Sequence, residues 1–413
     1  MKHATEIANN QYPERKPRLL WANVYCLLDT SSGASIAVRE MLRQLACNGY
    51  EIAIVGATIF DNPNGTYKLR EYWEDLQKNQ AKIIRINDGQ LLHSLILTKH
   101  TQRDEMTSKE ETLWLQLYTQ VLDAFKPDLV FYYGGQAIDL IVGAEAKYRG
   151  IPVMFYLANG NYTGKRWCRD VDLIVTDSQA TAGMYLERES YAITPVGAFI
   201  DPVSVVAAEH TRERLLFINP SLEKGAGLVI QLACLLEQRR PDIQFEVIES
   251  RGNWQVLVKA VTQSIGSPKE SLSNVIVTPH TDDMRSIYRR ARVLLAPSFW
   301  WESSGRVIAE AMLNGIPALI AGHGGSSEMM QNGGLVLKFP PECHVKPFTH
   351  IPKIETLKPL VDLLIRLYDD QSYYNDLVLK AYSVGQSIHS LRASTKRLMD
   401  AFEPFVNQRA GDK

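Results

Sequence analysis

Two glutamates, Glu302 and Glu310, lie in the segment Val293–Pro317, which reads VLLAPSFWWESSGRVIAEAMLNGIP. An apolar, strand-like run ends at Pro297, a loop with two tryptophans follows, and a helical pattern begins near Gly305. The first N–H groups of a helix have no partner within it and lie at the positive end of its dipole, so this helix start is suited to a diphosphate. We therefore expect Glu310 to accept the hydroxyls of a ribose and Glu302 those of an attached sugar.

Two glutamates at this spacing are more commonly a solvated helix face. The context favours a binding site instead. Glu310 follows a buried strand, an aromatic loop and a glycine at the helix start, and the sequence Gly-Ile-Pro ends the helix after it. The backbone that would surround the anion is Ser304, Gly305, Arg306 and Val307.

Lys224 lies between an apolar run and a second helical pattern that opens at Gly225. A cation beside a helix N-terminus stabilises the negative charge of a bound diphosphate. A surface lysine without a role is the alternative. We assign Lys224 to the catalytic site together with Glu302.

The elements that position these residues alternate short apolar runs with helical patterns along most of the chain. Most runs are apolar on both faces and followed by a helix, which predicts parallel sheets covered on both sides. The expected strands are Leu19–Leu28, Ile52–Gly56, Lys82–Ile86, Asp128–Tyr133, Val153–Leu157, Leu173–Val175, Leu215–Ile218, Phe245–Ile248, Asn274–Val277, Val293–Ala296, Ala318–Ile320 and Leu335–Leu337. Ligands of such sheets bind at the carboxyl ends of the strands.

The alternation breaks around Val196–Thr211 and then restarts. We therefore predict two doubly wound, Rossmann-like α/β domains, residues 1–204 and 205–385. A C-terminal helix, about residues 386–413, is expected to pack back on the first domain. The region Asn62–Ser108 is polar and is expected to be irregular and to contribute acceptor contacts or a mobile rim.

Composition excludes several classes of protein. The 45 basic and 46 acidic residues give a net charge of −1, which argues against a nucleic-acid partner. The five cysteines are scattered and never in CxxC spacing, so we expect neither a disulfide framework nor structural zinc. No signal peptide or transmembrane run is visible, which predicts a cytoplasmic protein. Peripheral membrane contact is compatible with the sequence, but no segment selects it.

The Val293–Pro317 segment resembles the E-x7-E signature of family 4 glycosyltransferases, which are retaining enzymes of the GT-B fold. Further segments resemble that family in the same order along residues 29–337. They are DTSSGASIAVREMLRQLACNGYEIAIV (Asp29–Val55), FINPSLEKG (Phe217–Gly225), TPHTDDM (Thr278–Met284) and GHGGSSE (Gly322–Glu328). The resemblance implies two domains facing each other across a deep cleft, and metal-independent transfer from a nucleoside-diphosphate sugar, with UDP the expected nucleotide.

The resemblance adds Gly33, Asn219 and His280 to the nucleotide-sugar site. The only DxD match, Asp170-Val171-Asp172, precedes its strand, so no metal and no other cofactor is predicted. Family members often carry an arginine shortly before the lysine that Lys224 resembles. Here Asn219-Pro220-Ser221 occupies that place, leaving Arg251 and Arg306 as candidates for a second cation.

The N-terminal half departs from the family, because no histidine follows the strands at Asp128–Tyr133 or Val153–Leu157. Two explanations compete. Tyr133, Asn159 or Asn161 serves the acceptor side instead, or activity is reduced. The sequence thus predicts a retaining, metal-independent hexosyltransferase that uses a UDP-sugar and an unidentified acceptor. The alternative is a catalytically weakened nucleotide-sugar-binding or scaffold subunit.

Overall fold

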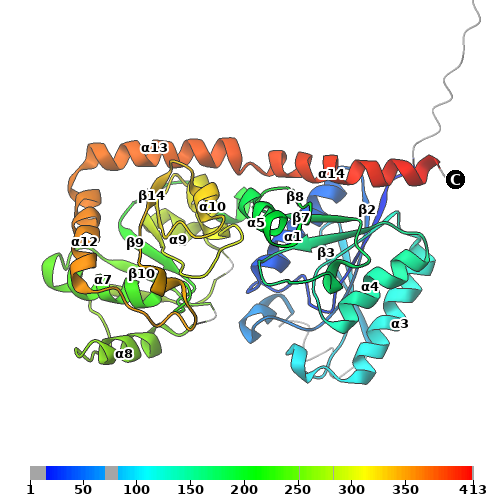
Figure 1. Cartoon of the computed structure of the whole chain (residues 1–413), viewed down its shortest axis with the longest axis horizontal. Coiled ribbons are helices and arrows are strands. Elements are labelled where there is room, and N and C mark those ends of the chain that lie inside the picture. Colours follow the sequence, from blue (N-terminus) through cyan, green and yellow to red (C-terminus); the bar gives the residue numbers. More distant parts are fainter. Residues whose placement is uncertain (1–14, 70–81, 251, 282, 412–413) are drawn as a thin grey trace, which may run out of the picture.

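The computed structural model describes residues 15–69, 82–250, 252–281 and 283–411. They form two α/β domains side by side, bridged by long C-terminal helices (Figure 1). In the described residues, the first sheet has the strand order β3-β4-β2-β1-β5-β6-β7-β8 and the second β11-β10-β9-β12-β13-β14. Neither the overall shape nor the strand order is encoded in any single segment.

The first sheet consists of parallel strands except at one edge, where β3 runs antiparallel to β4. Its strands are β1 (Arg18–Ala22), β2 (Glu51–Ala57), β3 (Ile83–Asp88), β4 (Leu91–Ile96), β5 (Leu129–Tyr132), β6 (Val153–Leu157), β7 (Leu173–Thr176) and β8 (Thr194–Pro195). The helices of this half are α1 (Gly33–Cys47), α3 (Ser108–Phe125), α4 (Ala137–Tyr148), α5 (Gln179–Glu189) and α6 (Pro202–Val205), with 3-10 turns at Pro63–Leu69, Arg103–Glu105 and Arg166–Cys168.

The second sheet is parallel throughout the strands described. Its strands are β9 (Arg214–Ile218), β10 (Phe245–Ile248), β11 (Val275–Thr278), β12 (Ala291–Ala296), β13 (Ala318–Ile320) and β14 (Gly334–Val336). The helices that follow β9 in the chain are α7 (Ala226–Arg239), α8 (Trp254–Ser264), α9 (Arg285–Arg290), α10 (Arg306–Leu313), α11 (Ser326–Met330), α12 (Ile354–Asp369), α13 (Gln371–Ile388) and α14 (Leu391–Gly411), with a 3-10 turn at Pro341–His344.

Each sheet is buried on both faces, because successive residues of a strand point to opposite sides. In β1, Leu19 and Trp21 pack on one face against α1, whereas Leu20 and Ala22 pack on the other against α3 and α4. The second sheet is likewise covered by α7, α8 and α12 on one face and by α9, α10 and α11 on the other. The prediction of doubly wound sheets from near-continuous apolar runs is confirmed.

Two expectations for the N-terminal half were wrong. The first strand ends at Ala22 and does not continue to Leu28, because the Asn23 side chain accepts from the N–H of Tyr25 (2.8 Å) and donates to the Tyr133 carbonyl (2.5 Å). The region Asn62–Ser108 is not irregular throughout, since β3 and β4 form a hairpin there. The remainder of that region includes residues 70–81, which lie outside the described residues.

Helices α13 and α14 run nearly in line across both domains (Figure 1). Ala381 and Val384 of α13 are buried in the second domain, whereas Leu398 and Phe402 of α14 are buried in the first. The Ser394 hydroxyl adds a hydrogen bond to the Ala198 carbonyl (2.8 Å). The end of the chain thereby ties the second domain to the core of the first. In the described part of the chain, no helix is long and apolar enough to cross a membrane.

Replacing Phe402 with leucine tests this tie. The Phe402 ring is fully buried and meets Phe131 edge-on at 5.5 Å between centroids, so we expect a loss of about 1–2 kcal/mol in the free energy of unfolding, measured by guanidinium denaturation. Lys396→Ala, on the exposed face of the same helix, serves as control and should change it by less than about 0.5 kcal/mol. Equal effects of the two variants would contradict the packing assignment.

Candidate active site

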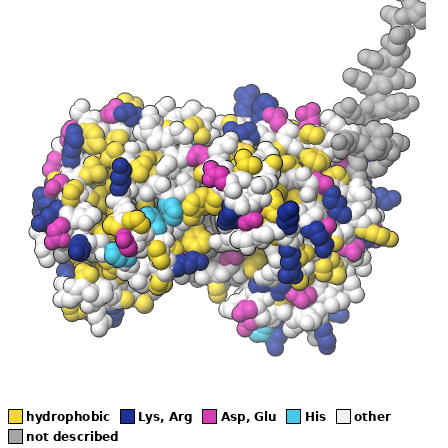
Figure 2. Space-filling model, viewed as in Figure 1, with side chains coloured by type: hydrophobic (Ala, Val, Ile, Leu, Met, Phe, Trp, Pro, Cys, Tyr) yellow, Lys and Arg dark blue, Asp and Glu magenta, His cyan; other side chains and the backbone are white. Residues whose placement is uncertain are grey.

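Residues that follow strands of both sheets line a cleft between the domains. The surface in Figure 2 is hollowed between the two domains. A cavity of about 470 Å³ is lined by both domains, and a second of about 370 Å³ adjoins it. Ile218, Asn219, Arg306 and Val307 line both cavities, so the two are continuous. Each volume falls within the range of about 300–1,000 Å³ that is usual for small-molecule sites.

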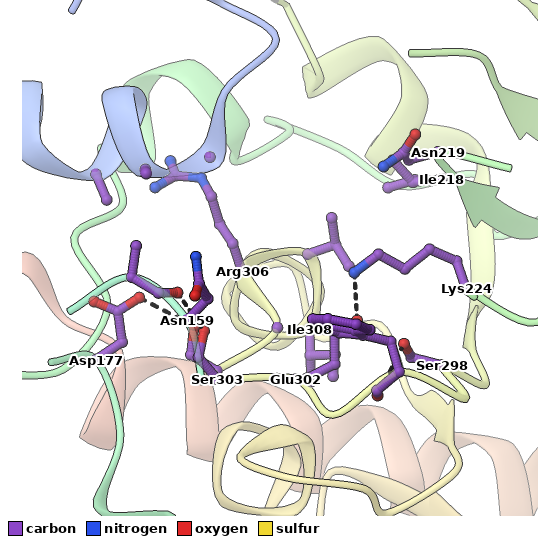
Figure 3. Close-up of a pocket in the computed structure, with 18 of the residues that line it drawn as sticks. Asn159, Asp177, Ile218, Asn219, Lys224, Ser298, Glu302, Ser303, Arg306 and Ile308 are labelled. Atoms are coloured by element: carbon purple, nitrogen blue, oxygen red, sulfur yellow. Dashed lines mark hydrogen bonds and ion pairs between the residues drawn. The ribbon is translucent and has the colours of Figure 1, made fainter. Parts of the chain in front are cut away.

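The N-terminus of α10 opens into the larger cavity. Gly305, with a φ of 83°, precedes the helix. Ser304, Arg306 and Val307 line the same cavity, and Arg306 is labelled there in Figure 3. Strand β12 ends immediately before this loop, which is why the helix begins at the edge of the sheet. The cavity therefore contains free backbone N–H groups and the positive end of a helix dipole.

Glu302 is positioned by backbone pairing with a glycine turn. The N–H of Gly325 donates to the Glu302 carbonyl (2.7 Å), and Glu302 and Gly324 form a parallel bridge. A Cβ atom at Gly324 would lie 2.1 Å from the Glu302 carbonyl oxygen, and φ of this residue is 73°, so only glycine fits. The segment GHGGSSE thus holds the loop that carries Glu302.

Lys224 and Glu302 contact each other directly, at 2.5 Å between Nζ and Oε1 (Figure 3). Both line the larger cavity. Gly225 makes the approach possible, because a Cβ there would lie 2.4 Å from the Pro297 carbonyl oxygen. A cation, a carboxylate and the N-terminus of α10 therefore meet in one cavity.

Glu310 lies inside α10, only 6% exposed, and lines the second cavity. Its carboxylate accepts a hydrogen bond from the Tyr288 hydroxyl (2.6 Å) and pairs with Nε of Arg306 (2.7 Å). Burial first, and then the Glu310 charge, raise the pKa of Tyr288 well above its usual value, so the phenol stays protonated and donates. Sequence reasoning missed Tyr288, which lies in α9.

The other residues that were predicted to bind the nucleotide sugar also lie at the cleft. Gly33 and Asn219 line the larger cavity, and His280 lines the second. The His280 Nε2 atom lies 3.4 Å from the Thr30 hydroxyl of the first domain. Arg306, the candidate second cation, donates to the Phe199 carbonyl (2.7 Å), whereas Arg251 lies outside the described residues.

On the acceptor side, Asn159 and Asn161 line the larger cavity, but Tyr133 is not among the residues lining either cavity. The Tyr133 ring packs against Trp21 at 5.5 Å between centroids, since the turn at Asn23 holds its backbone against β1. Of the two loop tryptophans, Trp300 lines the cavity. In the described residues, no group of three or more His, Cys, Asp or Glu side chains is arranged to hold a metal ion.

The sequence reasoning also missed Asp177, which follows β7 and lines the larger cavity. It accepts from Ser304 of the second domain (3.1 Å). Neighbouring contacts link the domains at the same place: the Ser303 hydroxyl donates to the Ala158 carbonyl (2.8 Å), and the Glu328 carboxylate accepts from the N–H groups of Gln179 and Ala180 (3.0 Å each). An acidic residue at the carboxyl end of a parallel strand, in VTDSQA, was the available signal.

Comparison with known proteins agrees with this architecture. Residues 212–349 match the family model described as Glycosyl transferases group 1. No curated protein matches the chain. Among solved structures, a glycosyltransferase from Rickettsia africae is similar over 95% of this chain and 99% of its own, with 12% identity and a TM-score of 0.67.

Two further similar structures contain ligands. HepE of Anabaena, in complex with UDP and glucose, is 15% identical over 93% of this chain and 99% of its own, with a TM-score of 0.64. The pneumococcal O-GlcNAc transferase GtfA, in complex with UDP and GlcNAc, is 10% identical over 95% and 99%, with a TM-score of 0.66. The likeness establishes the GT-B fold, with two Rossmann-like domains.

Proposed function

We propose that this protein is a glycosyltransferase of family 4 type that moves a sugar from a nucleoside-diphosphate sugar, a UDP-sugar, to an acceptor hydroxyl with retention of configuration. The observation that carries the proposal is the meeting of Lys224, Glu302 and the start of α10 in one cavity, with Glu310 in the adjoining one. The match to Glycosyl transferases group 1 over residues 212–349 supports it. The similar GT-B structures with UDP and a sugar bound suggest the nucleotide.

In this proposal, the diphosphate lies against the N-terminus of α10 and beside Lys224, the ribose against Glu310, and the sugar against Glu302. The bond between the anomeric carbon and the β-phosphate oxygen breaks while the acceptor oxygen forms its bond on the same face. The acceptor proton passes to the departing phosphate. The helix N–H groups and Lys224 stabilise the negative charge that develops on that phosphate, without a metal.

The second candidate is a nucleotide-sugar-binding subunit with weakened catalysis. The reason to consider it is that no histidine is among the described residues of the first domain that line the larger cavity. Those lining residues are of the types Ser, Gly, Ala, Asp, Tyr, Asn and Phe. In this alternative, the donor site is intact but the acceptor is not activated.

A donor panel tests the proposal. Incubation with UDP-, GDP- and ADP-sugars in the absence of acceptor is expected to release UDP slowly from one UDP-sugar, because water enters the acceptor position. NMR of the freed sugar should show the configuration of the donor. Tight nucleotide binding without release from any donor would favour the binding subunit, and scrambling of the sugar's own stereochemistry would indicate an epimerase. Failure to bind any nucleotide would overturn both proposals.

A further inference from the structure

Asp177 is a carboxylate of the first domain that lines the cavity proposed to hold the sugar diphosphate. It follows β7, at the carboxyl edge of the sheet. Figure 3 shows Asp177 and Asn159 on one side of the first turn of α10, with Lys224 and Glu302 on the other. The two charged groups of the second domain and the carboxylate of the first thus flank the same helix start.

Two hydroxyl groups hold the Asp177 side chain. The Tyr156 hydroxyl donates to both carboxylate oxygens (2.9 and 3.0 Å), and the Ser304 hydroxyl donates to one of them (3.1 Å). Tyr156 is buried in β6, so the phenol approaches Asp177 from a rigid element. A carboxylate accepts about four hydrogen bonds, and these two donors leave acceptor capacity toward the cavity.

Among the described residues, Asp177 has no ion pair with a lysine or arginine, unlike Glu302 and Glu310. A desolvated carboxylate without a cation is costly unless hydrogen-bond donors complete its shell. Sugar hydroxyls are such donors. Ser304 immediately precedes the N-cap of α10, so a sugar attached to a diphosphate at that helix start lies within reach of Asp177.

We propose that Asp177 is a sugar-binding residue, which accepts hydrogen bonds from hydroxyls of the sugar carried by the nucleoside diphosphate. This inference rests on the proposed function and deepens it: the first domain holds the transferred sugar through a carboxylate that follows β7. Asp177 is therefore also a residue that determines which sugar is accepted.

The ionisation of Asp177 gives this role a measurable signature. Burial raises the pKa of Asp177 to about 6, and the negative charge of Glu328 on α11 acts in the same direction. The hydrogen bonds from Tyr156 and Ser304 and the charge of Arg306 act in the opposite direction and lower this pKa. Above that pH the carboxylate is ionised and accepts from the sugar; below it, one oxygen carries a proton. The kcat/KM for the donor should therefore fall as the pH falls through about 6.

The decisive experiment compares Asp177→Asn with the wild type by calorimetry, using UDP and UDP-glucose, and UDP-N-acetylglucosamine in parallel, at a pH well above the Asp177 pKa. We expect the variant to bind the preferred UDP-sugar about tenfold more weakly and UDP with unchanged affinity, because UDP lacks the sugar. Equal loss for UDP and the UDP-sugar, or no loss for either, would overturn the inference. A wild type that binds neither ligand would overturn the proposed function itself.

The pH profile separates binding from a structural role. UDP-glucose is the suitable probe, because its diphosphate is esterified at both ends and lacks the terminal phosphate that titrates near pH 6 in UDP. Tyr156→Phe removes one donor to the carboxylate, so the acid limb of kcat/KM for UDP-glucose hydrolysis should move to higher pH; in Asp177→Asn the limb should disappear. Asp172→Asn, at the opposite end of the same strand, should keep the wild-type profile. An unmoved limb in both site variants would contradict the proposal.

Discussion

Replacing Lys224 with methionine is expected to lower kcat/KM for UDP-sugar turnover by about 10²–10³-fold, the usual cost of removing a preorganised group that stabilises transition-state charge. Methionine keeps much of the lysine stem, so packing around the 2.5 Å contact with Glu302 changes little. Steady-state release of UDP measures the effect. Lys259→Met, an exposed lysine of α8 that pairs with Glu270, is the matched control and should react like the wild type.

A double variant distinguishes two roles of Lys224. If the ammonium only neutralises Glu302, then Lys224→Met combined with Glu302→Gln should regain most of the lost activity, because no unpaired carboxylate remains. If it stabilises the departing diphosphate, as we propose, the double variant should stay at least as slow as Lys224→Met. Activity of Lys224→Met within a few-fold of the wild type would contradict the assignment of Lys224 to the catalytic site.

Glu310→Gln is expected to weaken UDP binding by about 10–100-fold, since hydrogen bonds to a charged acceptor contribute about 1.5–3 kcal/mol. Glu310 is 6% exposed, and Arg306 and Tyr288 already orient its carboxylate, as the proposed contact with two ribose hydroxyls requires. Glu302→Gln should leave UDP affinity nearly unchanged while it depresses turnover, because Glu302 contacts the sugar in the proposed binding mode. Calorimetric titration with UDP measures both variants.

The ribose analogue 2′,3′-dideoxy-UDP tests whether Glu310 acts through those hydroxyls. The wild type should prefer UDP over this analogue, and Glu310→Gln should lose most of that preference. Tyr288→Phe keeps the carboxylate and removes only one of its donors, so its effect on UDP affinity should be smaller. If Glu310→Gln weakens UDP and the analogue equally, the ribose assignment is wrong and the carboxylate acts by supporting Arg306.

Local patterns predicted the fold well, because a parallel sheet covered on both faces must use apolar runs separated by helices. The strand starts and ends of the second domain were correct within two residues, and the start of α10 near Gly305 followed from its glycine. In the hairpin of β3 and β4, the expected strand Lys82–Ile86 corresponds to β3 (Ile83–Asp88), whereas β4 (Leu91–Ile96) was missed because it lies in a region that was expected to be irregular. The end of the first strand was missed because the side chain of one residue, Asn23, decides it through two hydrogen bonds.

The sequence by itself determined the pattern on which the ligand prediction rests: a helix start, a lysine at another helix start and two glutamates are each visible in short segments. Only the tertiary structure decided which side chains meet. Lys224 reaches Glu302, and Asp177 reaches Ser304, from positions 78 and 127 residues apart in the chain. Such contacts depend on strand order and on how two domains close over a cleft, which no local periodicity encodes. The sequence places Asp177 after a strand, but only the folded molecule shows its contact with Ser304 and its place in the cavity.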